Sequence, residues 1–260
     1  MKNKHGLESK IENWLNRTSA ARSRWMSSFI HAQDWNSFPL PRWQAHRGYW
    51  KSGSPQNSLA SLIEARQRGA EMAEFDVRLT RDRIPILFHD AEIAGQPVED
   101  LRLSELLALQ PTTTLQEALS SREVPAFLNI ELKSELMGDD ALERYVTRIV
   151  EECGAEERIL FSSFNPFSVW KIANYLPAVP RALLVSPDLE RRSLREFWFA
   201  PFLRIHLLHL DERMLSEEEI GRWSRLGVPL AAWTVNDPDR IKELWDLGVR
   251  SVITDIVPRP

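Results

Sequence analysis

Short apolar runs alternate with amphipathic segments along most of the chain, beginning near residue 43. Between the runs, apolar residues recur at helical spacing, for example over 58–68 and 141–153. Strands that alternate with helices favour a parallel sheet, and eight such units predict a (β/α)8 TIM barrel. The predicted barrel strands are 43–47, 72–79, 127–133, 158–164, 181–185, 204–210, 229–235 and 250–255.

A ninth apolar run, at 84–89, follows the second predicted strand after only the short turn Arg81-Asp82-Arg83. A connection this short joins antiparallel neighbours, because a parallel crossover needs a dozen or more residues. We therefore expect 72–89 to form a β-hairpin above the barrel rim, followed by a short insertion. An open doubly wound sheet is the alternative fold, but no glycine-rich phosphate-binding loop follows the first strand.

Residues 1–40 have a different character, with many tryptophans and basic residues and apolar positions such as Leu7, Ile11 and Trp14 at helical spacing. We expect an N-terminal helical extension over 1–40 and one barrel domain over 41–260. The favoured interpretation is a helix that packs against the barrel. The alternative is a basic, aromatic helix that makes a peripheral contact with a membrane or a partner.

The composition excludes several functional classes. The net charge of −4 and the lack of a long basic run argue against nucleic acid as a partner. Cys153 is the single cysteine, which leaves neither a disulfide nor a cysteine-based metal site. No apolar run reaches the roughly 18 residues of a membrane span, and the N-terminus lacks a secretory signal. We expect a cytoplasmic protein whose membrane association, if any, involves only residues 1–40.

Charged residues are concentrated where the predicted strands end, and in a TIM barrel the active site lies there. Glu74 and Asp76 point to the same side of the second strand, and Glu131 lies on the third. Buried like charges are costly unless something cationic holds them. Three carboxylates without cysteine favour a hard divalent cation, Mg²⁺ or Ca²⁺. The alternative is a salt-bridge network with nearby basic residues, Arg47, Arg78 and Lys133.

Several motifs occur together in a characteristic order. They are HRG at 46–48, PQNSLAS at 55–61, GAEMAEFDVRLTRDRIPILFHD at 69–90, LNIELK at 128–133, WTVN at 233–236 and ITD at 253–255. In this combination the chain resembles the glycerophosphodiester phosphodiesterase family from about residue 43 to 258. The fold of that family is a (β/α)8 barrel, in agreement with the strand count above.

The resemblance implies a role for each matched residue. It implies that the metal ligands are Glu74, Asp76 and Glu131, that the acid–base pair is His46 and His89, and that Arg47 and Lys133 contact the phosphate. A cation and basic side chains neutralise charge on a phosphodiester, and two imidazoles can accept and donate the protons. Which histidine is acid and which is base stays open. Trp233 is expected either to form an apolar wall for the substrate or to pack at the barrel top.

The implied reaction is metal-dependent hydrolysis of a glycerophosphodiester to sn-glycerol 3-phosphate and an alcohol, through attack by the substrate's own 2-hydroxyl and a cyclic phosphate. Two alternatives remain. One is a lysophospholipase D that acts on lysophospholipids, and the other is a non-catalytic binding protein on the same fold. Since all the expected site positions carry suitable side chains, the binding protein is the least favoured.

Three departures from the family pattern bear on these expectations. The chain has Pro55-Gln56-Asn57-Ser58 where the family usually has Pro-Glu-Asn-Thr, and Arg83 where the hairpin turn usually carries glycine. The segment after His89-Asp90 is also shorter than in many members. A reduced covering segment predicts an open pocket that accepts a large alcohol, which motivates the lysophospholipase alternative.

Overall fold

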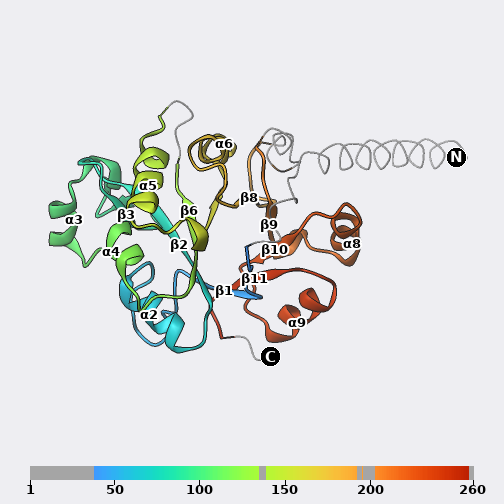
Figure 1. The fold of residues 1–260 in the computed structure, drawn as a ribbon. Coiled ribbons are helices and arrows are strands. Elements are labelled where there is room, and N and C mark those ends of the chain that lie inside the picture. Colours follow the sequence, from blue (N-terminus) through green and yellow to red (C-terminus); the bar gives the residue numbers. More distant parts are fainter. Residues whose placement is uncertain (1–37, 135–138, 192–194, 196–202, 258–260) are drawn as a thin grey trace, which may run out of the picture.

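The barrel strands form a closed parallel sheet (Figure 1). The computed structural model describes residues 38–134, 139–191, 195 and 203–257. Each strand pairs in parallel with the next, and β1 closes the ring by pairing with both β2 and β11. The predicted TIM barrel is therefore confirmed. Its strands are β1 (Trp43–His46), β2 (Met72–Leu79), β6 (Phe127–Leu132), β7 (Ile159–Ser163), β8 (Arg181–Val185), β9 (Leu207–Asp211), β10 (Leu230–Trp233) and β11 (Ser251–Thr254).

Helices cover the outside of the barrel (Figure 1). Their starts follow from capping residues: the side chains of Ser58, Asn165 and Ser216 each accept a hydrogen bond from a backbone N–H in the first turn. Pro238 occupies the first turn of its helix, where the missing N–H costs nothing. The covering helices are α2 (Leu59–Gln67), α4 (Leu115–Ser120), α5 (Ala141–Glu152), α6 (Pro166–Tyr175), α8 (Glu217–Arg225) and α9 (Pro238–Asp246).

The predicted hairpin is also confirmed. Strand β3 (Pro85–Leu87) pairs antiparallel with the end of β2, with Val77 opposite Leu87. Arg83 in the connecting turn has a φ of 64°, the left-handed conformation that favours glycine. This backbone conformation explains why the family that the motifs resemble usually has glycine at this position. The insertion that follows contains the strand pair β4 (Glu92–Ile93) and β5 (Gln96–Pro97) and the helix α3 (Leu103–Leu109).

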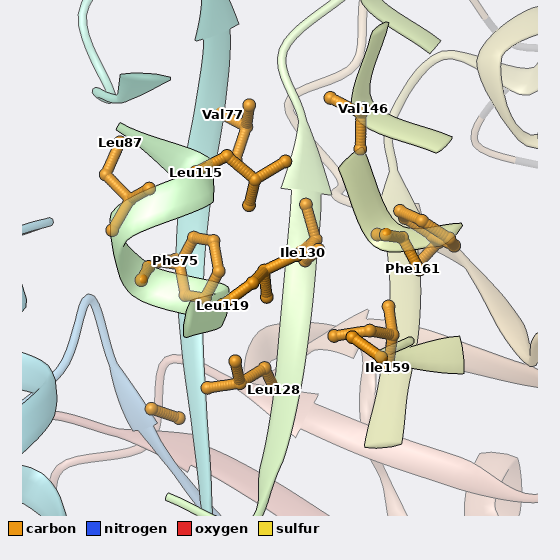
Figure 2. Close-up of a cluster of buried hydrophobic side chains, with 14 of the residues drawn as sticks. Phe75, Val77, Leu87, Leu115, Leu119, Leu128, Ile130, Val146, Ile159 and Phe161 are labelled. Carbon is orange, nitrogen blue, oxygen red and sulfur yellow. The ribbon is translucent and has the colours of Figure 1, made fainter. Parts of the chain in front are cut away.

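The outward-facing side chains of β2, β6 and β7 pack against the covering helices (Figure 2). Phe75, Val77 and Ile130 alternate with the inward-facing carboxylates and contact an apolar layer that includes Leu115 and Val146. All of these side chains are fully buried. Burial of this kind contributes roughly 1.5–3 kcal/mol per side chain, so the apolar residues of β2 fix which of its residues point inward.

The barrel interior is filled below the strand ends, so the polar residues above form a floor rather than a pore. The lowest layer is apolar, and Phe38 closes it from below, with its ring 5.4 Å from that of Phe127. Above it lies a hydrogen-bonded polar chain: Asn129 Nδ2 donates to Gln44 Oε1 at 2.9 Å, and Ser162 Oγ donates to Asn129 Oδ1 at 2.9 Å. These bonds offset the cost of burying the amides.

Six of the eight predicted strands begin or end one to three residues away from the observed bounds. The first strand ends at His46 because Arg47 has a φ of 56°, which no strand residue adopts. The third ends at Leu132, so Lys133 follows it, and the sixth starts at Leu207 rather than 204. The predicted extension over 1–40 lies almost entirely outside the described residues. None of the described helices is long and apolar enough to cross a membrane.

Candidate active site

Three buried carboxylates meet at the carboxyl ends of β2 and β6. Glu74 and Asp76 point inward from alternate positions of β2, and Asp76 is paired in register with Glu131 of β6. One carboxylate oxygen from each residue lies within 4.8 Å of the others. The three residues are only 2%, 1% and 8% exposed, respectively. The structure thus brings the three predicted metal ligands together.

Two cationic side chains compensate part of this negative charge, and both contact Asp76. Lys133 Nζ lies 2.9 Å from Asp76 Oδ1 and also forms an ion pair with Glu131. Arg47 Nε lies 3.3 Å from Asp76 Oδ2. The salt-bridge network expected from the sequence therefore exists around Lys133 and Arg47. Arg78 takes a different place, since its Nε donates to the backbone carbonyl of His89 at 2.9 Å.

The pKa values show which carboxylates are compensated. Burial alone would raise the pKa of Asp76, but the Lys133 ammonium and the Arg47 guanidinium lower it below its ordinary value. Burial, followed by repulsion from Asp76 and Glu131, raises the pKa of Glu74 well above its ordinary value. Burial and then Asp76 raise the pKa of Glu131 to about 7, although Lys133 opposes the shift. Among the described residues, the two cationic side chains therefore compensate Asp76 more fully than Glu74.

Two observations indicate that the cluster fits a divalent cation: its negative charge is incompletely compensated, and one of its carboxylate oxygens has no hydrogen-bond partner among the described residues. Glu74 Oε2 accepts a hydrogen bond from the backbone N–H of Arg47 at 3.1 Å. Glu74 Oε1 is buried and has no hydrogen-bond partner among the residues that the structure describes. A buried carboxylate oxygen without a partner is costly, and carboxylates are the preferred ligands of hard cations. The group of Glu74, Asp76 and Glu131 could therefore hold a divalent metal ion.

Asn57 orients the central carboxylate. Its Nδ2 donates to Asp76 Oδ2 at 2.8 Å, and its Oδ1 accepts from the backbone N–H of Asp76 at 3.0 Å. Its neighbour Gln56 accepts a hydrogen bond from Arg47 Nη1 at 2.9 Å. The segment before α2 thus fixes both Asp76 and the guanidinium beside it. The sequence indicated only that local hydrogen bonding differs here, and it did not reveal that Asn57 contacts the carboxylate cluster.

His46 lies at the end of β1, opposite Glu74 in the β1–β2 register. Its Nδ1 is 2.7 Å from Asp255 Oδ1. Asn236 Nδ2 donates to Asp255 Oδ2 at 2.7 Å, and Asn236 Oδ1 accepts from the Asp255 backbone N–H at 2.8 Å. Asp255 and Asn236 occur within two of the sequence motifs, but the contact with His46 joins residues 209 positions apart and is visible only in the fold.

His89 lies after β3, the hairpin strand that pairs with the end of β2. Its Nδ1 is 2.7 Å from Oδ1 of the adjacent residue, Asp90, which is largely exposed. Burial lowers the pKa of His89, and the attraction of Asp76 and Asp90 does not offset that effect. Both predicted histidines therefore lie at the rim of the carboxylate site, each with a carboxylate on Nδ1.

An aromatic wall and a polar cavity flank Lys133. Trp233 packs edge-to-face on Phe164 with ring centroids 5.3 Å apart, and its Nε1 donates to the His209 carbonyl at 3.1 Å. Lys133 Nζ lies 5.9 Å from the centre of the Phe164 ring. A cavity of about 460 Å³ between the hairpin and the segment after β6 is also lined by Lys133. Its other polar lining residues include Arg78, Arg81, Glu99, Asp100 and Asp139.

Comparison with known proteins decides the family. The model of the glycerophosphoryl diester phosphodiesterase family matches residues 46–258, which include every site residue described above. The chain belongs to this family. The resemblance seen in the sequence motifs is thus confirmed, and the protein is, at the level of its family, a glycerophosphodiester phosphodiesterase.

Relatives of this phosphodiesterase align over most of its length. A glycerophosphodiester phosphodiesterase of Caldanaerobacter subterraneus is 26% identical over 229 residues, which cover 81% of this chain and 92% of the relative. A putative glycerophosphodiester phosphodiesterase of Bacillus subtilis is 28% identical over 232 residues, covering 81% and 93% of the two chains.

Solved structures of the family share the barrel. The phosphodiesterase of Oleispira antarctica, in complex with its product sn-glycerol 3-phosphate, is 28% identical, with a TM-score of 0.67 over 83% of this chain and 93% of its own. A glycerophosphodiester phosphodiesterase from Parabacteroides distasonis is also 28% identical, with a TM-score of 0.68 over 82% and 92%.

Proposed function

We propose that this phosphodiesterase is metal-dependent and hydrolyses glycerophosphodiesters to sn-glycerol 3-phosphate and an alcohol. The observation that carries the proposal is the cluster of Glu74, Asp76 and Glu131, buried and incompletely compensated beside two cationic side chains. The product complex of the Oleispira antarctica phosphodiesterase, at 28% identity, supports glycerol 3-phosphate as the product.

The proposed metal ligands are the carboxylates of Glu74, Asp76 and Glu131, with Mg²⁺ or Ca²⁺ as the cation because every donor is an oxygen. When bound, the cation supplies positive charge that offsets the negative charge of the phosphodiester oxygens. The orphaned Glu74 Oε1 is the atom that gains most from such a cation, since it has no hydrogen bond to exchange.

Arg47 and Lys133 are the proposed phosphate contacts. Both side chains are mostly buried, and in the structure both contact Asp76. Burial would lower the pKa of Lys133, but Glu131 and Asp76 raise it, so its ammonium stays charged. A charge held in a water-poor site stabilises developing phosphate charge more strongly than one in solution. Trp233, packed on Phe164, would form the apolar wall beside the phosphate.

His46 and His89 are the proposed acid–base pair. They follow β1 and β3, two strands that both pair with β2, and each has Nδ1 occupied by a carboxylate. The second ring nitrogen of each therefore remains for proton transfer. One imidazole removes the proton of the attacking hydroxyl, and the other protonates the departing alcohol oxygen.

A lysophospholipase D activity is the second candidate. The Trp233–Phe164 wall offers an apolar surface next to Lys133, and the cavity of about 460 Å³ leaves room for a large group on the other side. A lysophospholipid would place its acyl chain along the aromatic wall and its head group in the polar cavity.

The test is a comparison of substrates with identification of the products. Purified protein is incubated in Mg²⁺ with glycerophosphoethanolamine, glycerophosphocholine or lysophosphatidylcholine. We expect glycerol 3-phosphate to be released from the first two, with a kcat/KM at least about tenfold above that for the lysolipid. A preference for lysophosphatidylcholine would establish the second candidate. No turnover of any of the three diesters would contradict both.

A further inference from the structure

Asp255 has no assigned part in the reaction, yet it is the side chain best placed to control His46. Its Oδ1 lies 2.7 Å from His46 Nδ1, and its carboxylate is mostly buried, with 13% of the side chain exposed. We propose that Asp255, held by Asn236, is a positioning residue that makes His46 the general base of the first chemical step. This inference rests on the proposed function and assigns the two histidines different roles.

Asn236 holds Asp255 from two directions. Its Nδ2 donates to Asp255 Oδ2 at 2.7 Å, while its Oδ1 accepts from the Asp255 backbone N–H at 2.8 Å. The hydroxyl of Thr254 donates to the same Asn236 oxygen at 3.2 Å. The ends of β10 and β11 are thereby joined, and the carboxylate cannot turn away without breaking these contacts. A rigid partner fixes the imidazole plane better than a mobile one.

The contact determines which ring nitrogen of His46 carries the proton. An ionised carboxylate only accepts hydrogen bonds, so a neutral His46 must donate from Nδ1. Burial would raise the pKa of Asp255, but the hydrogen bond and charge interaction with His46 and the bond from Asn236 lower it, which keeps the acceptor ionised. Nε2 is then unprotonated and can accept a proton. Asp255 also stabilises the imidazolium that forms, as the aspartate of a serine-protease triad does.

The corresponding pair of His89 and Asp90 is weaker. Asp90 is 75% exposed and adjacent to His89 in the chain, and no second described side chain bonds to its carboxylate. Solvent screens an exposed pair, so Asp90 stabilises a His89 imidazolium less than Asp255 stabilises that of His46. Asp255 thus gives the better-held partner to His46, which leaves His89 as the general acid.

The proton balance of the two steps follows. The substrate 2-hydroxyl loses its proton to His46 Nε2 as its oxygen bonds to phosphorus. The bond from phosphorus to the alcohol oxygen breaks, and that oxygen takes a proton from His89. In the second step water attacks the cyclic phosphate, His89 accepts the water proton, and His46 returns its proton to the 2-oxygen. Both histidines regain their starting state.

A diester with an activated leaving group separates the two roles. 4-Nitrophenol leaves without protonation, so loss of a general acid costs little on glycerophospho-4-nitrophenol, whereas loss of a general base costs the same on both substrates. We expect Asp255→Asn to lower kcat by about 10- to 100-fold on glycerophosphoethanolamine and on the nitrophenyl diester alike, with KM within threefold. We expect the loss of kcat caused by His89→Ala to be at least tenfold smaller on the nitrophenyl diester than on glycerophosphoethanolamine.

Asp90→Asn is the matched control and should lower kcat less than fivefold on either substrate. Asp255→Glu should recover part of the rate. The proposal is overturned if the Asp255→Asn defect disappears on the nitrophenyl diester, or if kcat of Asp255→Asn equals that of the wild type.

The positioning role can also be tested without turnover, by measuring which ring nitrogen of His46 carries the proton. The ¹⁵N resonances of the His46 ring should report a proton on Nδ1 in the wild type and a mixture of tautomers in Asp255→Asn. Both proteins should show the same Mg²⁺-induced rise in melting temperature, which establishes that the variant is folded. An unchanged tautomer in Asp255→Asn would refute the positioning role. Failure of the wild-type protein to cleave either diester would instead refute the proposed function.

Discussion

At the scale of single residues, the main energetic cost of the site is three buried carboxylates with only two close cationic partners among the described residues. Lys133 and Arg47 both serve Asp76, which leaves Glu74 with one hydrogen bond from the Arg47 backbone. An apolar side chain at position 74 would be easier to bury, since a buried charge without a partner costs several kcal/mol. The carboxylate is therefore best explained by a ligand that contributes positive charge.

The substitution Glu74→Gln tests this explanation through stability. The amide keeps the shape of the side chain and removes the repulsion that Asp76 and Glu131 exert on it. We expect the melting temperature in EDTA to stay equal or to rise, and the rise produced by Mg²⁺ in the wild type to be lost. Binding at about 100 times the dissociation constant stabilises a protein by about 2.7 kcal/mol, which a thermal scan detects easily.

The matched control is Glu99→Gln, an exposed carboxylate of the insertion that should leave the Mg²⁺ response unchanged. A normal Mg²⁺ response in Glu74→Gln would show that Glu74 is not a ligand. A large loss of stability in EDTA would show instead that the carboxylate has a structural partner.

Most residues of the site could be predicted from the sequence. Glu74, Asp76 and Glu131 were predicted to meet because alternate strand positions face the same side, and the family resemblance added Arg47 and Lys133. The structure brings all five together. The catalytic and ligand roles of these residues stay predictions. Asn57 and Asp255 could not be assigned from the sequence, because their contacts depend on how the barrel closes.

At the scale of elements, the turn between β1 and α2 positions the Arg47 backbone over Glu74. Arg47 and Gly48 both have positive φ, and the Gly48 backbone N–H donates to the carbonyls of Ala45 and Glu74. The Ser61 hydroxyl donates to the Arg47 carbonyl at 2.9 Å and ties this turn to α2. A side chain at position 48 would meet the backbone of the helix.

Gly48→Ala should therefore be strongly destabilising. Its Cβ would lie 2.4 Å from Ser61 Oγ and 2.6 Å from the Ser61 carbonyl carbon, in a backbone conformation with a φ of +75°. We expect a loss of about 3 kcal/mol in the free energy of unfolding by urea, from overpacking added to left-handed strain. Gly53→Ala, with a φ of +110° and nothing within 4 Å, should lose only about 1 kcal/mol. Equal losses would contradict the steric argument.

The elements themselves were predicted better than their ends. Each barrel strand lies within or close to its predicted range, because apolar runs and capping residues are local signals. The ends depend on tertiary contacts: β1 stops where Arg47 turns toward Glu74, and β9 begins only where it pairs with β8. The two-stranded unit of β4 and β5 was not predicted, since strands of two residues leave no periodic pattern.

At the scale of the whole molecule, closure of the barrel brings distant residues together and buries them. The protonation of the buried carboxylates therefore affects the stability of the fold. Burial raises the pKa of Glu131 to about 7 and that of Glu74 well above its ordinary value of 4.5. In the metal-free protein these groups stabilise the fold while they are protonated. That contribution is present below about pH 4.5, the unfolded value, and is lost as the pH rises through about 7.

Because the metal-free protein favours protonated carboxylates, the stabilisation by Mg²⁺ should depend on pH. Protons compete with the cation for the same carboxylates, so the difference in melting temperature between Mg²⁺ and EDTA should grow from pH 5.5 to pH 8. Thermal scans in both conditions across this range measure it, and Glu74→Gln should flatten the curve. A difference that stays constant with pH would contradict binding at these carboxylates.

The most direct test of the central claim, that Glu74, Asp76 and Glu131 hold the metal ion on which catalysis depends, is the restoration of activity to metal-stripped protein. The rate of glycerol 3-phosphate release from glycerophosphoethanolamine is measured in EDTA and as Mg²⁺ or Ca²⁺ is added back. We predict no turnover without the ion, recovery in the wild type, and no recovery in Glu74→Gln. Full activity of the stripped wild type, or recovery of Glu74→Gln to the wild-type rate, would contradict the claim.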